Sequence, residues 1–502
     1  MKLDHGVANV FQTIAVTDGR ELRWITAEVC RQLKQKYGSR LIAYCRSKDS
    51  GDYYRALGWF DEVIEQDLLH LVALEPVADE VSVFARARRI EGVLNDTYNR
   101  SRMIRRDFGR GFYLGGSGHP KAYYSEVPSW PQMVNGYNEL FDFWLDEYRN
   151  KGITLHLNPL KEEAVVARAL NVPVRYLYAA RIDNLFYWAV NEMIDNPFVE
   201  PAFRALEASH VEVIEDLGQY AQDAGQRRLI VGTKPYRRLL QRLWSITYQW
   251  FYRFRHRSGM RPSYYYWSNV AYLVREALDQ YRLRYPRVPR LDDLRDQKFV
   301  YFPLHTEPEM SLHWMSPECF IQLEAIARLA RDLPADTLLV VKETIYGFGR
   351  RPRDFYEQLR AFRNVVVIDA FERGIDVMQA SVAVATMTGS GGLEAALTGK
   401  PVLLFGRHNY YDFLDHVRRV WRDDDLRPAI RDLVETEIDR PKAQRDGARL
   451  KEAVRRVCFD MGSYSNVTPH KFEPVVVDRA TTGLQATFDG ALATMPDEWR
   501  LR

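Results

Sequence analysis

A glycine-rich segment, TMTGSGGLEAALTG at residues 386–399, has the residue types that bind a phosphate. Small or absent side chains let backbone N–H groups approach a ligand closely, and they stand at Thr388, Gly389, Ser390, Gly391 and Gly392. A helix is predicted to begin immediately behind them, with Glu394 on its first turn, where a carboxylate could accept hydrogen bonds from ribose hydroxyls. The same residues would also suit a tight strand-to-helix turn in which Glu394 only stabilises the helix start.

Two further pairs of charged residues lie in short loops of the same half of the chain. Glu307 and Glu309 bracket Pro308, which favours an extended loop and would direct both carboxylates away from the preceding strand. One of them could act as a general acid or base, or both could be solvated loop acids. Lys342 and Glu343 could bind a ligand or form a local ion pair.

The elements that must position these residues are strands alternating with helices. Five apolar runs, separated by helical patterns, predict a doubly wound parallel sheet; they lie at residues 298–305, 337–343, 364–369, 381–388 and 401–406. Ligands of open α/β sheets bind beyond the carboxyl ends of the strands. His305, Lys342 and the glycine-rich segment follow three of these strands, so we expect them at one edge of the sheet.

The first half of the chain shows the same alternation. Residues 7–16 and 40–45 are predicted strands around a helix at 19–37, and residues 153–159 and 172–178 bracket a second, shorter helix. The first turn lacks the GxGxxG pattern of dinucleotide-binding folds. A chain of 502 residues exceeds the size of one ordinary core, so we expect two α/β lobes.

The predicted domains divide the chain at three points. Residues 1–223 form an N-terminal α/β lobe, 224–290 a basic aromatic helical insertion, 291–424 a C-terminal Rossmann-like lobe, and 425–502 a helical tail packing across the lobes. Residues 224–275 form the sharpest break, because they contain eleven Lys or Arg and no Asp or Glu.

The basic aromatic stretch allows three interpretations. Its cations and aromatic side chains, including Arg237, Arg238, Arg242, Trp244 and Trp250, could lie on an anionic membrane. They could instead line an acceptor groove, where aromatic faces stack on sugars and arginines pair with carboxylates. A partly buried helical layer between the lobes is the third.

Composition excludes several classes of protein. The formal net charge of +3, from 70 basic and 67 acidic residues, argues against a nucleic-acid-coating protein. Neither a signal peptide nor a membrane-spanning run is present, so we expect a cytoplasmic protein. The four cysteines show no metal-ligand or disulfide spacing. We therefore expect no metal and no cofactor.

The motifs LHTEPE, VKET, FYEQL, NVVVID and TGSGGLEAALTGKPVLLFG, within residues 298–420, resemble the capsule polysaccharide biosynthesis family. This family comprises bacterial glycosyltransferases of the GT-B fold, including transferases of Kdo (3-deoxy-D-manno-oct-2-ulosonic acid) from CMP-Kdo. The resemblance implies two Rossmann-like lobes facing a central cleft, with a nucleotide sugar on the second lobe and a glycan or lipid-linked glycan acceptor approached from the first. The family often carries His-Pro directly after the Lys-Glu pair, whereas Thr344 and Ile345 stand here, so the donor sugar and nucleotide stay open.

For the individual residues, the resemblance implies a donor site at His305, Lys342, Glu343, Glu394 and the glycine-rich segment. Sugar transfer needs a base for the acceptor hydroxyl or a carboxylate nucleophile, and the candidates are Glu307, Glu309 and Asp183. The predicted function is a glycosyltransferase of bacterial surface polysaccharide assembly, with possible contact to the inner face of the cytoplasmic membrane. A nucleotide-sugar epimerase or hydrolase of the same fold, or a catalytically impaired scaffold, is the alternative.

Overall fold

The computed structural model describes residues 10–68, 72–102, 120–121, 126–206, 235–256, 265–284, 288–307, 310–317, 319–466 and 468–488. Contacts between Cα atoms divide the chain into two compact units. Unit 1 comprises residues 1–102, 128–206 and 451–502, and unit 2 comprises residues 103–127 and 207–450. The predicted boundaries at 223 and 290 stay predictions, and the one at 424 falls inside a helix of unit 2.

Unit 1 contains a seven-stranded sheet in the order β13-β6-β5-β4-β1-β2-β3. Strands β1 to β5 pair in parallel, whereas β6 and β13 are antiparallel to their neighbours. Its strands are β1 Thr13–Thr17, β2 Arg40–Cys45, β3 Glu62–Glu65, β4 Leu155–Leu157, β5 Val174–Ala179, β6 Leu185–Ala189 and β13 Phe459–Asp460. Its helices are α2 Arg23–Tyr37, α3 Lys48–Leu57, α5 Glu80–Leu94, α6 Tyr98–Arg102, α8 Trp130–Lys151, α9 Lys161–Ala169, α10 Val199–Arg204 and α21 Pro474–Ala486.

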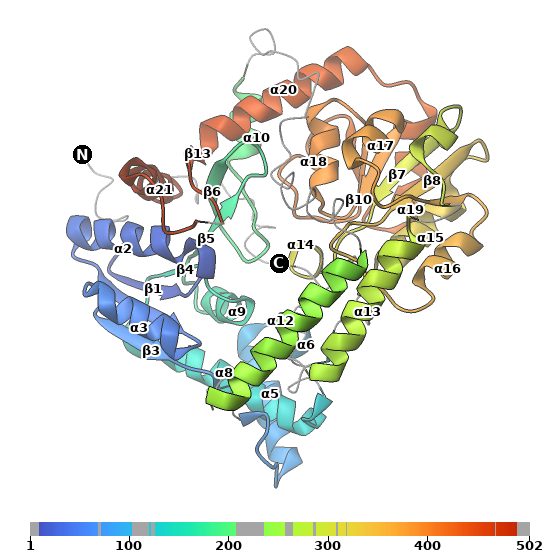
Figure 1. Cartoon of the computed structure of the whole chain (residues 1–502). Helices are drawn as coiled ribbons and strands as arrows, with labels where there is room; N and C mark the ends of the chain where they lie inside the picture. Colours follow the sequence, from blue (N-terminus) through green and yellow to red (C-terminus); the bar gives the residue numbers. More distant parts are fainter. Residues whose placement is uncertain are drawn as a thin grey trace. The chain divides into compact units, whose positions relative to one another are not determined.

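The core of unit 1 joins the two ends of the chain. Ile14 and Val16 of β1 and Val29 of α2 belong to one buried cluster with Val476 and Leu484 of α21. Figure 1 shows α21 beside α2, as their contacts require. Helix α21, near the C-terminus, is therefore part of the core of unit 1.

Unit 2 contains a six-stranded, fully parallel sheet in the order β12-β11-β10-β7-β8-β9. Its strands are β7 Lys298–Pro303, β8 Thr337–Lys342, β9 Val365–Ile368, β10 Ala383–Thr386, β11 Val402–Leu404 and β12 Val417–Arg419. Its helices are α12 Pro235–His256, α13 Tyr266–Arg282, α14 Met310–His313, α15 Gln322–Asp332, α16 Phe355–Ala361, α17 Gly374–Ala380, α18 Ser390–Leu397 and α19 Asp423–Ile430. Helix α20, Arg440–Val457, begins in unit 2 and ends in unit 1.

Helices cover both faces of the unit 2 sheet. Val300 and Phe302 of β7 are buried in one cluster with residues of α15, α16 and α19. Tyr301 points to the other face, where its hydroxyl lies 3.4 Å from the position of a Cβ on Gly374 of α17. Alternate residues of one strand thus face opposite layers, which explains its continuous apolar sequence.

The predicted fold class is confirmed, since the chain forms two α/β units built on Rossmann-like sheets. The predicted strand at 40–45 has the observed bounds, whereas the one at 7–16 is observed as β1, beginning at Thr13. The basic aromatic stretch forms two helices, α12 and α13, that pack against each other as a hairpin in Figure 1.

Candidate functional site

The strand order of unit 2 determines where a ligand can bind. From β7 the chain adds β8 and β9 on one side of the sheet. It then crosses to the other side of β7 and adds β10, β11 and β12 there, so the direction of strand addition reverses between β7 and β10. Beyond the carboxyl ends of β7 and β10, the following loops diverge to opposite faces and leave a crevice. His305 follows β7 and the glycine-rich segment follows β10, so two predicted donor-site motifs meet at this point.

The glycine-rich segment forms the N-terminus of α18. Gly389 is the N-cap residue and supplies no side-chain hydrogen bond to the helix start. Ser390 is exposed and Gly391 is half-buried. The first N–H groups of the helix therefore receive no side-chain cap, and together with the helix dipole they suit a phosphate.

The glycines of this segment have different structural requirements. A Cβ on Gly389 would lie 2.6 Å from Cε1 of His305, and one on Gly392 would lie 2.5 Å from Cγ2 of Thr386. A Cβ on Gly391 would lie 3.3 Å from Cγ of Pro303, a contact that a small shift relieves. Gly389 and Gly392 are thus required for packing, whereas Gly391 is the position closest to tolerating a side chain.

His305 lies buried beneath the glycine-rich segment. Its Nε2 is 3.1 Å from Oγ1 of Thr386, and that hydroxyl also accepts a hydrogen bond from the Gly389 amide at 3.3 Å. Gln322 fixes the His305 backbone by accepting from its N–H at 2.6 Å and donating to its carbonyl at 3.2 Å. The side chain of Thr388 is also buried, with its Cγ2 against Gly406. His305 and Thr388 therefore support the loop from below.

A buried arginine organises the carboxylates of this edge. The guanidinium of Arg351, which is fully buried, lies 3.1 Å from Oε2 of Glu307 and donates to Oε2 of Glu343 at 2.8 Å. It also donates to the His305 carbonyl at 2.5 Å, and Tyr356 donates to Glu343 at 2.8 Å. One cation thus links the loops after β7 and β8.

This cluster defines the surroundings of two predicted site residues, Glu307 and Glu343. Glu307 is not a solvent-facing loop acid, because it is buried and engaged by Arg351 and Gln322. Burial raises the pKa of Glu307, although Arg351 opposes the shift. The two carboxylates hold the pKa of Arg351 above its usual value. Glu343 pairs with Arg351 instead of Lys342, so we assign Glu307 and Glu343 to positioning the edge.

Two other predicted donor-site residues keep a position suited to a ligand. Lys342 ends β8 and is half-buried, with its Nζ 3.3 Å from the carbonyl oxygen of Glu343. Glu394 lies one turn into α18 and not on its first turn, because the helix begins at Ser390. Burial raises the pKa of Glu394, and its carboxylate has no hydrogen-bond or ion-pair partner among the described residues.

The remaining catalytic candidates lie elsewhere or outside the described residues. Glu309 lies outside them. Asp183 belongs to unit 1, in the turn between the antiparallel strands β5 and β6, with φ of 50° and an ion pair to Arg455 at 3.0 Å. Aspartate tolerates this left-handed backbone in turns, which accounts for its presence there.

The structure separates the arginines of the basic aromatic stretch. Arg238 and Arg242 both pair with Glu276 of α13, so they hold the hairpin together. Arg237 and Trp244 are exposed, and Trp250 is exposed while contacting the ring of Tyr266 at 5.7 Å. The predicted group of five is therefore divided between packing and surface.

A second crevice, in unit 1, was missed from the sequence. Its sheet reverses order at β1, between β2 and β4. There Thr17 donates to Glu163 at 2.5 Å and lies 2.9 Å from Nε2 of His156, whose Nδ1 is 2.6 Å from the Tyr148 hydroxyl. Burial lowers the pKa of His156 to about 3, so this histidine is neutral. In the sequence, this hydrogen-bonded network of Thr17, His156, Glu163 and Tyr148 is indicated only by isolated polar residues within apolar runs.

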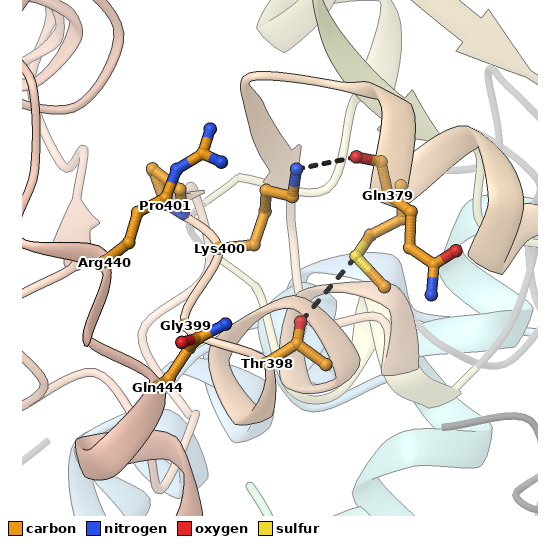
Figure 2. A pocket seen from close by; sticks show the side chains of 8 residues that line it. Gln379, Thr398, Gly399, Lys400, Pro401, Arg440 and Gln444 are labelled. Carbon is orange, nitrogen blue, oxygen red and sulfur yellow. Dashed lines mark hydrogen bonds between the residues drawn. The ribbon is translucent and has the colours of Figure 1, made fainter. Parts of the chain in front are cut away.

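A cavity of about 180 Å³ lies at the opposite edge of the unit 2 sheet from the glycine-rich segment. It is bounded by the ends of α17 and α18 and the beginning of α20. Figure 2 shows Lys400 pointing toward Gln379, while Arg440 lies on the other side of the cavity. Lys400 donates to the carbonyls of Gln379 and Ser381 at 2.8 and 2.6 Å, so its charge stabilises the end of α17.

No helix within the described ranges is both long and apolar enough to cross a membrane. Among the same residues, no group of three or more His, Cys, Asp or Glu side chains is arranged to hold a metal ion.

The family comparison agrees with the motifs. Residues 239–414, which are 176 of the 502 residues, match the family model for the capsule polysaccharide biosynthesis protein. This match confirms the resemblance to that family over the segment that contains the donor-site motifs. No curated protein sequence matches the chain.

Solved structures with a similar arrangement include three from bacteria. KpsC of Thermosulfurimonas dismutans, a beta Kdo 2,7 transferase, is 15% identical over 61% of this chain and 80% of its own, with a TM-score of 0.27. S. aureus MnaA with UDP is 11% identical over 96% and 98%, with a TM-score of 0.26. Anabaena Alr3699/HepE with UDP-glucose is 10% identical over 96% and 100%, with a TM-score of 0.30.

Proposed function

We propose that the protein is a glycosyltransferase of bacterial surface polysaccharide synthesis that transfers a sugar from a nucleotide donor to a glycan acceptor. The observation that carries the proposal is the N-terminus of α18. It combines a helix start without a side-chain cap, an exposed Ser390 and the nearby carboxylate of Glu394, at the crevice where α/β sheets bind ligands. The capsule family match covers this segment.

The chemistry of transfer assigns a role to each of these groups. As the bond from the sugar to the phosphate breaks, negative charge grows on the departing nucleotide. The N–H groups of Ser390 and Gly391, together with the cation of Lys342, would stabilise that charge. Glu394 would accept hydrogen bonds from the ribose hydroxyls.

We infer that Glu307 positions the site and is not the base that deprotonates the acceptor, because Arg351 holds its carboxylate inside unit 2. Glu309 stays a candidate, as does Asp183, whose side chain is partly exposed in unit 1. The proposal places the acceptor, a glycan or a lipid-linked glycan, on the side of unit 1. We also propose that the protein is cytoplasmic and works without a metal or cofactor. CMP-Kdo, which would supply Kdo, is one candidate donor.

Nucleotide binding tests the donor site directly. Titration calorimetry with CMP, UDP, GDP and their sugars would identify the nucleotide, and Gly391→Val should weaken its binding by about tenfold or more because a side chain would obstruct the N–H groups. Gly92→Val is the matched control, since the space around a Cβ on Gly92 is open. Wild-type affinity in a folded Gly391→Val protein would contradict this donor site.

Transfer itself needs a second assay. The nucleotide sugar that binds should yield a glycosylated product only when a glycan or lipid-linked acceptor is present. Free sugar or an epimer formed without any acceptor would replace the transferase proposal with a hydrolase or an epimerase. Absence of binding to every nucleotide would indicate a scaffold.

A further inference from the structure

Helix α12 exposes a row of large apolar side chains, whereas two of its arginines, Arg238 and Arg242, are half-buried. Five large side chains of this helix are between 52% and 74% exposed, and we call them the aromatic stripe: Tyr236, Leu240, Trp244, Tyr248 and Phe251. They are separated by four, four, four and three residues. At about 100° of rotation per residue they occupy an arc of about 120°. The stripe is therefore one continuous face of the helix.

The opposite face of α12 explains why apolar side chains are exposed while two arginines are half-buried. Arg238 and Arg242 point toward α13, where both pair with Glu276. Leu239 and Leu273 line the narrow space between the two helices. The face that packs in the hairpin thus uses two of the cations, while the aromatic residues remain on the outside. A surface helix of a globular protein normally has the reverse arrangement.

Helix α13 repeats the pattern. Its exposed large apolar residues are between 40% and 76% exposed, and they are Trp267, Val274, Leu278 and Tyr281. Their spacing of seven, four and three residues again keeps them within one narrow arc. Both helices of the hairpin therefore present an apolar face that lies away from their mutual contact.

The charges around the stripe favour an anionic partner. Residues 224–275 contain eleven Lys or Arg and no Asp or Glu, and Arg237 lies exposed within the arc of the stripe. The first acid after this stretch, Glu276, is neutralised by two arginines. Exposed aromatic residues in a basic, acid-free stretch of sequence are suited to the interface of a bilayer with anionic lipids, where tryptophan and tyrosine rings are favoured.

We propose that the aromatic stripe of α12 docks on the surface of an anionic membrane, with the helix lying in the plane of the interface. Its 22 residues give a helix about 33 Å long, which can insert its aromatic rings along one side without crossing the bilayer. The docking surface is separate from the donor site at α18. It therefore stands or fails independently of the proposed sugar transfer.

Vesicle flotation with the full-length protein tests this inference. Wild-type protein should float with vesicles of phosphatidylglycerol and phosphatidylcholine at low salt, and much less with pure phosphatidylcholine. The triple variant Leu240→Ser, Trp244→Ser, Phe251→Ser should bind the anionic vesicles at least about tenfold more weakly, because it loses the inserted apolar area. The matched control, Val81→Ser with Trp130→Ser, removes exposed apolar residues of unit 1 and should float like wild type.

Three results would overturn the proposal. The first is failure of the wild-type protein to float with anionic vesicles, and the second is flotation of the triple variant equal to that of wild type. Light scattering without lipid could also show a wild-type dimer that the triple variant abolishes, and the stripe would then be a contact between two copies of the chain. Nucleotide affinity, measured on the same triple variant, should equal that of wild type and so confirm that the variant is folded.

Discussion

Arg351 is the residue that determines the conformation of the donor edge in unit 2. It is fully buried, and it joins Glu307 and Glu343 while donating to the carbonyl of His305. Such a cation is stabilised only while its carboxylates remain, since an uncompensated buried charge is costly. The cluster therefore holds the loops after β7 and β8 together, and we propose that the chemistry requires other residues.

The substitution Glu307→Gln distinguishes positioning from catalysis. It leaves Arg351 with Glu343 alone, so we expect the free energy of unfolding to fall by about 3 kcal/mol. Turnover per folded molecule should stay within about threefold of wild type, whereas loss of a general base costs about 100-fold or more. Urea unfolding and transfer assays measure the two effects, with exposed Glu357→Gln as the control. A large loss of turnover at unchanged stability would restore Glu307 to the catalytic role.

His156 makes the stability of unit 1 depend on pH. Its pKa is about 3 in the folded protein and 6.5 in an unfolded chain, so the unfolded state binds more protons between these values. The free energy of unfolding is therefore highest, as far as His156 is concerned, above pH 6.5. As the pH falls from 6.5 toward 3, it decreases by about 1.4 kcal/mol per pH unit. Urea unfolding between pH 7 and 4.5 should be less steeply pH-dependent in His156→Asn than in wild type. Exposed His470→Asn should retain the wild-type slope.

At the scale of elements, Lys400 links the end of α17 to the beginning of β11. Its hydrogen bonds to the carbonyl of Gln379, drawn in Figure 2, and to that of Ser381 satisfy acceptors at the end of the helix. Lys400→Met should lower the free energy of unfolding by about 1–3 kcal/mol. Lys298→Met, which removes a surface pair with Asp336, should cost under about 1 kcal/mol. Equal thermal shifts in the two variants would contradict the capping role.

The strands of unit 2 could be predicted from the sequence, whereas contacts between distant residues could not. Apolar runs predicted β7 to β11 and the loops after them, because a parallel sheet buried on both faces requires such runs. The helix was predicted to begin behind the glycine-rich residues, since glycine is unfavourable in helices, whereas α18 begins at Ser390; Glu394 was consequently assigned to the first turn. The role of Arg351 could not be predicted from the sequence, because the His305 carbonyl to which it donates lies 46 residues away along the chain. Likewise Glu276, one residue beyond the acid-free stretch, pairs with two of its arginines.

At the scale of the whole molecule, the chain builds unit 1 from both of its ends. Trp188 of β6 donates to the carbonyl of Ala480 at 2.8 Å, and Arg175 of β5 donates to Thr487 at 2.8 Å. Strand β13 adds to the sheet edge beside β6. Within the predicted helical tail, β13 and α21 are therefore structural parts of unit 1, whereas residues 425–450 belong to unit 2, as does the donor site at α18.

Truncation after residue 457 tests this division. Removing β13 and α21 would expose the cluster around Ile14, Val29 and Leu33, so unit 1 should lose its cooperative unfolding transition. Unit 2 contains its own core and should still unfold cooperatively in calorimetry. A nucleotide that binds the full chain should raise the transition temperature of unit 2 equally in both proteins, because ligand binding stabilises only the unit that holds the site. If the truncated chain kept both transitions, α21 would be dispensable; if it lost both, the two units would not fold independently.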